Sequence, residues 1–381
     1  MRLLHTSDWH LGRSLHRADL SAAQEQFLDH LVEVVRTEAV DAVLIAGDVY
    51  DRAIPPVDSV RLFEESLWRL HDAGTQIVVI SGNHDSPQRL GVNSGLLEKT
   101  GVHLRTRVAD CARPVILPAP GGDEVAVYAL PYLEPDAIRQ ELGADVGRSH
   151  ADVLGAALAR SAADRAGRDP ASLVLLAHGW VVGGEASDSE RDISVGGVGS
   201  VPASLFDGFA YAAFGHLHRP QEVSGTVRYS GSALPYSFSE AGHPKGTWLA
   251  DLGSNDVQFV PTPVHRRLSS LRGELDFLLA SPTLAEYEQD FVAITLIDAA
   301  RPLGAMDRLR ARFPGVLTLS WEPAIGTTDS AGSYSKLVRN RGDLDVAVDF
   351  VEYVRNTPAT EAERELLADA FTAIRADEDA A

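Results

Sequence analysis

Aspartate, histidine and asparagine residues gather in five short motifs that follow one another along the chain. The motifs are Asp8-Trp9-His10, Gly47-Asp48-Val49-Tyr50-Asp51, Gly82-Asn83-His84-Asp85, His178-Gly179 and Gly215-His216-Leu217-His218. Carboxylate and carboxamide oxygens suit Mg²⁺ and Mn²⁺, and imidazole nitrogens suit Mn²⁺, Fe²⁺ and Zn²⁺. The motifs hold enough ligands for two divalent ions, and a pair of such ions is suited to breaking phosphate esters.

The spacing within the motifs favours shared binding. Asp8 and His10 are two residues apart, as are His216 and His218, and side chains at this spacing point to the same side of an extended backbone. Asp48 follows a glycine at the expected end of a strand, where its carboxylate could bridge two ions. Any one of these residues alone could equally be a cap or a solvated loop residue, but the ordered set favours a metal centre.

Alternating strands and helices position the first three motifs. Apolar runs predict strands over residues 2–7, 40–46 and 76–81, and helical periodicity predicts helices over residues 20–38 and 58–73. This order implies parallel strands with crossover helices. Each motif then lies just past the carboxyl end of a strand, where the ligand sites of open α/β sheets collect.

The second half of the chain repeats this arrangement less regularly. We predict a helix over residues 150–166 and strands over residues 125–130, 172–177, 209–214, 227–230 and 246–252, of which the last two look antiparallel. The pattern indicates an α/β fold of two sheets packed face to face, with helices outside.

A domain boundary is expected at Pro261-Thr262-Pro263, because prolines stiffen the chain and remove donors from a sheet. Three domains follow from this boundary: residues 1–265, a capping domain over 266–340, and C-terminal helices over 341–381. The capping domain is predicted to be a small α+β unit, and the C-terminal region to be a pair of helices. The predicted elements beyond the boundary are strands over 291–297 and 315–319, a helix over 303–312, a loop over 326–343, and helices over 345–355 and 360–374.

Composition limits the possible functions. The chain has 381 residues, a net charge of −20 and a pI of about 5.0, which argue against a large phosphate-binding surface. Bound metal ions or a partner subunit could still supply positive charge. The single cysteine, Cys111, excludes an intramolecular disulfide, and no apolar run has the length of a signal peptide core or a membrane span. We therefore expect a cytoplasmic protein that does not enter a membrane.

The motifs and their flanks resemble the calcineurin-like metallophosphoesterase superfamily. The wider context is similar to one branch of it, the DNA-repair nucleases that act with a coiled-coil ATPase of the SbcC type. The resemblance covers residues 1–265 well and the remainder in outline, and it implies a four-layer α-β-β-α sandwich. Its cues are His5-Thr6-Ser7-Asp8-Trp9-His10-Leu11-Gly12, Ile45-Ala46-Gly47-Asp48-Val49-Tyr50-Asp51, Ile80-Ser81-Gly82-Asn83-His84-Asp85-Ser86, Gly215-His216-Leu217-His218-Arg219-Pro220-Gln221 and Tyr229-Ser230-Gly231-Ser232.

The resemblance also implies a role for each site residue. Asp48 bridges the two ions, and His84 binds neither ion but protonates the leaving oxygen. Asp85 and Asp51 support the site without binding metal, although Asp51 stands where some archaeal relatives have a histidine. One ion is held by Asp8, His10, Asp48 and His218, and the other by Asp48, Asn83, His178 and His216.

The implied activity is that of a DNA endonuclease and exonuclease. The branch cleaves double strands from 3′ to 5′ with ATP, and cuts single strands and hairpins, using two divalent ions, in the first place Mn²⁺, with Mg²⁺ as the alternative. Arginines beside the motifs could contact DNA phosphates or simply form surface ion pairs. These arginines are Arg13, Arg17, Arg52, Arg89 and Arg219.

The implied assembly is a heterotetramer of two nuclease chains and two ATPase chains. Residues 58–73 and 87–97 would form a homodimer interface, or alternatively belong to the core. The C-terminal helices would grip the ATPase coiled coil, or alternatively cover the chain's own surface. Two other functions stay open: a phosphatase or nucleotide phosphodiesterase of the same superfamily, and a non-catalytic DNA-end scaffold, against which the presence of His84 argues.

Overall fold

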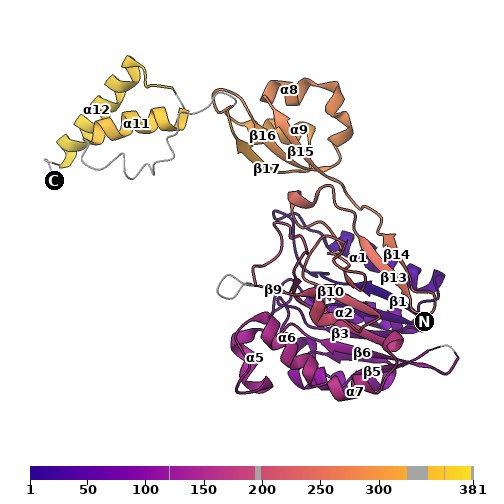
Figure 1. Cartoon of the computed structure of the whole chain (residues 1–381). Helices are drawn as coiled ribbons and strands as arrows, with labels where there is room; N and C mark the ends of the chain where they lie inside the picture. The colour runs from indigo at the N-terminus through magenta and orange to yellow at the C-terminus, as the bar shows by residue number, and fades with distance from the viewer. Residues whose placement is uncertain (120, 194–198, 324–341, 356, 379–381) are drawn as a thin grey trace. The chain divides into compact units, whose positions relative to one another are not determined.

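The computed structural model describes residues 1–119, 121–193, 199–323, 342–355 and 357–378 (Figure 1). The chain divides into two compact units, Met1–Leu268 and Ser269–Ala381. All five motifs lie in the first unit.

The first sheet has six strands, and its central part is parallel. β1 pairs with β2, β2 with β3 and β3 with β4, all in parallel register, whereas β13 runs antiparallel to β1. In spatial order the strands are β14 (Asp256–Pro261), β13 (Gly246–Asp251), β1 (Arg2–Thr6), β2 (Ala42–Ile45), β3 (Gln76–Ile80) and β4 (Val102–Arg105).

The second sheet also has six strands. β6, β7, β10 and β12 are parallel neighbours, and antiparallel β5 and β11 lie at the two edges. In spatial order the strands are β11 (Gln221–Glu222), β12 (Val227–Tyr229), β10 (Tyr211–Gly215), β7 (Leu173–His178), β6 (Glu124–Leu130) and β5 (Val115–Pro118). A short parallel pair, β8 (Trp180–Val181) and β9 (Ser200–Val201), stands apart from both sheets.

The two sheets pack face to face. Leu44 and Val78 of the first sheet belong to one buried cluster with Val174, Leu176 and Ala213 of the second. Alternate residues of the same strands, which point to the other face, are also buried, and so both sheets must be covered on both sides.

Helices cover the two outer faces. α1 (Ser21–Thr37) and α2 (Val57–Asp72) lie over the first sheet, where the Trp9 ring contacts Phe27 and Phe63, each at 6.1 Å between ring centroids. α6 (His150–Ala159) buries Val153 and Leu154 against the second sheet. α5 (Pro135–Leu142) and α7 (Ala162–Ala166) lie beside it (Figure 1). The predicted α/β fold, a four-layer α-β-β-α sandwich, is thereby confirmed.

The remaining short helices of this unit follow β3. They are α3 (Pro87–Leu90) and α4 (Ser94–Leu97). Ser86 caps α3, because its side-chain oxygen accepts the amide of Arg89 at 3.4 Å.

Three expectations about the elements differ from the structure. The helix predicted over residues 150–166 is two helices, because the α-helical pattern is interrupted at Arg160 and Ser161, whose amides donate to carbonyls three residues back. The strands predicted over residues 227–230 and 246–252 both form: β13 is antiparallel to both of its neighbours, whereas β12 is antiparallel to β11 but parallel to β10. The strands β4, β5, β14 and β15 (Leu268–Gly273) were not predicted, because their apolar runs are short or interrupted by polar residues.

The second unit contains a three-stranded sheet and two described helices that pack on it. The strands are β15 (Leu268–Gly273), β16 (Phe291–Leu296) and β17 (Val316–Trp321), and the helices are α8 (Leu275–Ala280) and α9 (Ala305–Arg312). Leu275 and Leu278 of α8 and Leu309 of α9 bury their side chains against Ile294. α11 (Asp343–Arg355) and α12 (Glu361–Glu378) contact each other. The loop predicted over residues 326–343 falls outside the described residues except for its last two positions.

Among the described residues, none of the helices combines the length and the apolarity that crossing a membrane requires.

One histidine joins the two sheets through the core. His5 of β1 is fully buried, and its Nε2 and Nδ1 lie 3.1 Å from the carbonyl oxygen of Phe214 and 3.0 Å from the hydroxyl of Tyr211, both in β10. A neutral ring satisfies both contacts, because Nε2–H donates to the carbonyl while Nδ1 accepts from the hydroxyl. Burial lowers the pKa of His5 to about 3.

This buried imidazole predicts a specific loss of stability in acid. The unfolded chain binds a proton at His5 below a pH of about 6.5, whereas the folded chain does not until about 3, so that stability is full above this window and declines as the pH falls. Between about pH 7.5 and 5, the wild type should lose about 2 kcal/mol more unfolding free energy than a His5→Gln variant. Urea unfolding in EDTA at both pH values measures this difference, and equal losses would contradict it.

Candidate metal centre

The five motifs lie at the carboxyl ends of neighbouring strands in both sheets. β1, β2 and β3 present the first three motifs, and β7 and β10 present the last two. The amide of Asp8 donates to the carbonyl oxygen of Gly47 at 3.0 Å. The amide of His216 donates to the Asp8 carboxylate at 3.1 Å, across 208 positions of sequence. These bonds bring the motif loops of the two sheets into one place.

Two glycines allow this close approach. A Cβ atom on Gly215 would lie 2.0 Å from the carbonyl oxygen of Ala46, and one on Gly82 would lie 2.1 Å from Oδ1 of Asp48. Any side chain at either position would therefore push the strand ends apart. This is the physical reason for the glycines beside the ligand residues in the sequence.

Four of the site residues have left-handed backbones. The φ angles are 51° at Asp8, 45° at His10, 50° at Asp48 and 106° at His216. Such angles are uncommon outside glycine and cost of order 1–3 kcal/mol each, and they persist only where the surroundings enforce them. They concentrate here on the residues whose side chains converge.

One group of ligand atoms surrounds His10. Its Nε2 lies 3.1 Å from Nε2 of His218 and 3.7 Å from Oδ2 of Asp48. Asp8, His10 and His218 each offer one ligand atom within 4.8 Å of the others. Together with Asp48, these three residues are the first of the two predicted ligand sets.

A second group surrounds Asn83. Its side-chain oxygen lies 2.9 Å from Nε2 of His178 and 3.2 Å from Nδ1 of His216. Nε2 of His178 lies 3.7 Å from Oδ2 of Asp48. Oδ2 of Asp48 is therefore 3.7 Å from a histidine nitrogen of each group, a position that suits the predicted bridging carboxylate.

The centre is buried, and burial governs its charges. It raises the pKa of Asp48 well above its usual range, and the nearby charges of Asp8 and Asp85 raise it further. It lowers the pKa of His10 and His216 well below theirs, and their neighbouring histidines add to this effect. The imidazoles are therefore neutral, with lone pairs available for metal ions.

These residues fit divalent cations. The Nε2 atoms of His10 and His218 face each other, and the buried Nδ1 of His10 has no hydrogen-bond partner among the described residues. Within the same residues, Asp48 forms no ion pair with lysine or arginine, although Asp8 and Asp85 lie beside it. Cations between these groups would balance the charge and bind the lone pairs, and a mixed oxygen and nitrogen set suits borderline ions. The geometry suits two divalent ions.

Asp85 supports the loops of the centre. Its carboxylate accepts the amides of Val49 at 3.1 Å, Tyr50 at 2.9 Å and Gly82 at 2.9 Å. The carboxylate thus holds the second motif against the third, and no ligand atom of the two groups above bonds to it. Burial raises the pKa of Asp85 to about 6, against the effect of these hydrogen bonds.

His84 lies at the edge of the centre with one ring nitrogen restrained. Its Nδ1 is 2.7 Å from the carbonyl oxygen of Asp51, to which it donates, and its Nε2 is 3.9 Å from Oδ2 of Asp48. Burial lowers the pKa of His84 to about 4, and Arg191 and Arg13 lower it further. Asp51 thus acts on His84 through its backbone, and its side chain lies 3.7 Å from Nε of Arg13.

The five arginines beside the motifs differ in their surroundings. Arg13 donates to the carbonyl oxygen of Ser189 at 2.8 Å and lies over the ring of Tyr236. Arg89 donates to a backbone carbonyl, Arg219 pairs with Glu185, and Arg17 and Arg52 are exposed. Of the five, the structure places only Arg13 in contact with the side-chain network of the centre.

The sequence did not reveal a layer of residues behind the histidine ligands. Ser189, Glu190 and Arg191 come from the segment after β8, and Glu240 and Lys245 follow β12. Glu190 accepts the amide of His218 at 2.7 Å, and Arg191 donates to the carbonyl oxygen of Asn83 at 3.3 Å. The polar cluster at residues 187–191 was the only sequence signal, and such clusters are common in ordinary loops.

The fold and the centre are those of a metal-dependent hydrolase of phosphate esters. The family model described as calcineurin-like phosphoesterase matches residues 1–220, more than half of the chain and all five motifs. The chain belongs to the calcineurin-like phosphoesterase family.

The position of Asp48 between the two groups predicts the effect of its removal. An Asp48→Asn variant should bind Mn²⁺ at least about 100-fold more weakly at both sites, since even residues behind a metal ligand typically change affinity 10–100-fold. Mn²⁺ titration by calorimetry measures both affinities.

Asp51→Asn is the matched control for this prediction. It removes a nearby carboxylate but keeps the backbone carbonyl that holds His84. Its Mn²⁺ affinities should equal those of the wild type. Equal losses in the two variants would show that general negative charge, and not a bridging position, controls binding.

Proposed function

We propose that the protein is SbcD, the nuclease subunit of an SbcCD-type DNA-repair complex. In this proposal it acts as an ATP-dependent 3′–5′ double-strand exonuclease and a single-strand and hairpin endonuclease in DNA repair, recombination and replication. The observation that supports catalysis in this proposal is His84, whose Nδ1 is fixed by the Asp51 carbonyl while Nε2 lies 3.9 Å from Oδ2 of Asp48. A non-catalytic scaffold would not need this arrangement.

The chain's own residues have separate tasks in the proposed hydrolysis. A pair of divalent ions, Mn²⁺ in the first place, supplies positive charge against the phosphate and lowers the pKa of the attacking water. His84 in its protonated form donates from Nε2 to the leaving oxygen. An anionic phosphate nearby raises the pKa of His84 from its low value in the free protein, so that substrate binding favours the proton it must donate. Arg13 and Arg191 add positive charge beside His84.

DNA as the substrate is supported by the parts beyond the phosphoesterase core. A second unit, Ser269–Ala381, follows the core, and its last helices leave Phe350 and Leu366 largely exposed. Exposed apolar side chains on paired helices suit the proposed docking of an SbcC-type coiled-coil ATPase. A cytoplasmic location is part of this proposal.

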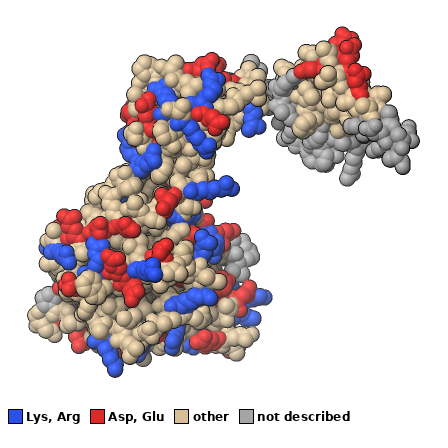
Figure 2. Space-filling model, turned by 180° about the vertical axis from the view of Figure 1, so that it is seen from behind, with Lys and Arg blue, Asp and Glu red and all other residues tan. Residues whose placement is uncertain are grey.

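Charge favours a second candidate, a phosphatase or nucleotide phosphodiesterase that does not act on DNA. The net charge is −20, and on the face in Figure 2 cationic and anionic side chains are interspersed, with no broad basic area. A small phosphoester needs no extended basic surface. The two candidates differ in substrate and not in the metal centre.

Hairpin cleavage separates the candidates. The purified chain should cut a labelled DNA hairpin and degrade a linear duplex in Mn²⁺, and an SbcC-type ATPase with ATP should stimulate both. His84→Ala should lower cleavage about 10²–10⁴-fold, the usual contribution of a general acid, while Mn²⁺ affinity stays unchanged. Hydrolysis of a small phosphodiester without any cutting of DNA would instead support the second candidate.

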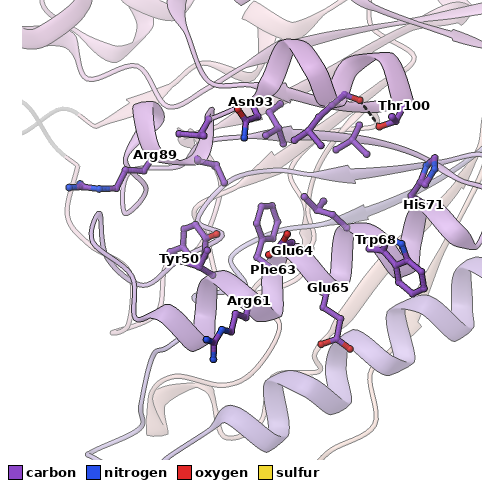
Figure 3. A pocket seen from close by; sticks show the side chains of 17 residues that line it. Tyr50, Arg61, Phe63, Glu64, Glu65, Trp68, His71, Arg89, Asn93 and Thr100 are labelled. Carbon is purple, nitrogen blue, oxygen red and sulfur yellow. Dashed lines mark hydrogen bonds between the residues drawn. The ribbon is translucent and has the colours of Figure 1, made fainter.

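A homodimer is part of the proposed assembly, and an apolar groove supports one candidate interface. The groove has a volume of about 750 Å³ and lies between α2 and the segment that holds Asn93 and Thr100 (Figure 3). Trp68 lines it although its side chain is 65% exposed, and Leu96 nearby is 66% exposed. Large apolar side chains left this exposed on a helix favour a contact with a second copy.

The dimer proposal predicts the effect of one surface substitution. Trp68→Glu should convert a dimer to a monomer in sedimentation velocity, because the charge would have to be buried at the interface. Leu303→Glu replaces an even more exposed apolar side chain, 93% exposed, in the second unit and should leave the dimer intact. A monomeric wild type at micromolar concentration would contradict the proposal.

A further inference from the structure

A chain of hydrogen bonds runs from His218 into the protein interior. Nδ1 of His218 contacts Oγ of Ser189, and this hydroxyl lies 2.6 Å from Oε1 of Glu240. The other carboxylate oxygen of Glu240 pairs with Lys245, whose ammonium also donates to the backbone carbonyl of His218 at 2.8 Å. This series of hydrogen bonds thus begins at the side chain of His218 and ends at its backbone carbonyl.

The hydrogen-bond donors in this chain can be assigned. Glu240 acts as an ionised acceptor at both oxygens: Oε1 accepts the amide of Tyr236 at 3.1 Å, and Oε2 accepts the ammonium of Lys245. An ionised carboxylate only accepts, and so the Ser189 hydroxyl donates to it. The oxygen of Ser189 then accepts from Nδ1–H of His218. Nε2 of His218 is therefore left with its lone pair, and this is the atom that faces His10.

The other histidines of the centre lack such support among the described residues. Nδ1 of His178 bonds to a neutral backbone carbonyl, that of Ala46, at 2.8 Å. Nδ1 of His10 has no partner, and Nδ1 of His216 points to the amide oxygen of Asn83. Only His218 is connected through a hydroxyl to a carboxylate. A carboxylate behind a liganding imidazole fixes its tautomer and increases its basicity.

The network is costly to bury, which indicates that it serves more than stability. Glu240 is 1% exposed and Lys245 is 9% exposed. The free-energy cost of removing two opposite charges from water usually offsets most of their attraction. Well-packed apolar residues in their place often stabilise a fold as well or better. The Glu240–Lys245 ion pair lies directly behind His218, a predicted metal ligand, and can therefore act on that ligand.

We propose that Glu240, acting through Ser189, is a positioning residue that sets the affinity of the ion held by Asp8, His10, Asp48 and His218. The ion held by Asn83, His178 and His216 with Asp48 is independent of it. The inference rests on the two-ion centre within the proposed function, but not on DNA as the substrate.

Mn²⁺ titration of the full chain without nucleic acid tests this proposal. The wild type, Ser189→Ala and Glu240→Gln are stripped with EDTA and titrated by calorimetry. Ser189→Ala should weaken one of the two Mn²⁺ sites by about 10–100-fold and leave the other unchanged. Glu240→Gln should weaken the same site, and Ser189→Thr, which keeps the hydroxyl, should restore the affinity of the wild type.

Ser239→Ala is the matched control. Its hydroxyl accepts the amide of Asp188 at 3.2 Å and so contacts the same segment of chain, but not the network behind His218. It should leave both affinities unchanged. Thermal unfolding in EDTA measures any loss of stability in Ser189→Ala, and positioning is separated from folding because a loss of stability would weaken both Mn²⁺ sites, whereas a loss of positioning weakens one.

Three results would overturn the proposal. They are wild-type affinities in both Ser189→Ala and Glu240→Gln, an equal weakening of the two sites, and a weakening in Ser189→Ala that Ser239→Ala reproduces. None of them depends on cleavage. If DNA is not cut while one Mn²⁺ site is selectively weakened, the nuclease assignment fails and the role of Glu240 stands.

Discussion

The carboxylate of Asp48 is the constraint on which the centre depends. It is almost fully buried, it lies beside Asp8 and Asp85, and the described residues provide no lysine or arginine in contact with it. Among the described residues, its side-chain partners are the amide of His84 and the Nε2 atoms of His10, His84 and His178. Burial raises the pKa of this carboxyl, and divalent cations between these groups would balance its charge in the ionised form. The backbone strain, the close glycines and the convergence of two sheets all serve to hold this one group in place.

Much of the fold could be predicted because its determinants are local. Short apolar runs such as the one before Asp8 form buried parallel strands, and helical periodicity placed α1 and α2 nearly to the residue. The α/β sandwich followed from their order. The strands near residues 227 and 246 were predicted, but the sheet that each one joins was not, because no local pattern specifies partners that lie far away in the sequence.

The residues of the metal centre could also be predicted only in part. The seven predicted ligand residues lie together in the structure, since each stands directly at a strand end, next to a glycine or to another ligand. Ser189, Glu240 and Lys245 could not be found, because they lie 29, 22 and 27 positions from His218 in the sequence, in a loop, at the end of a short 3-10 helix and just before β13. A polar side chain in a loop has the same appearance in the sequence whether it faces water or a ligand. Contacts of this kind are settled only by tertiary packing.

The ligands of the centre come from both sheets, Asp8 and Asp48 from the first and His178 and His216 from the second. A bound ion therefore links the two sheets. Because it binds the folded state alone, it stabilises the folded state by mass action. In a cell, the supply of divalent metal would then influence how long each chain survives proteolysis, and not merely how fast it turns over substrate. Metal starvation would reduce the abundance of the protein as well as its activity.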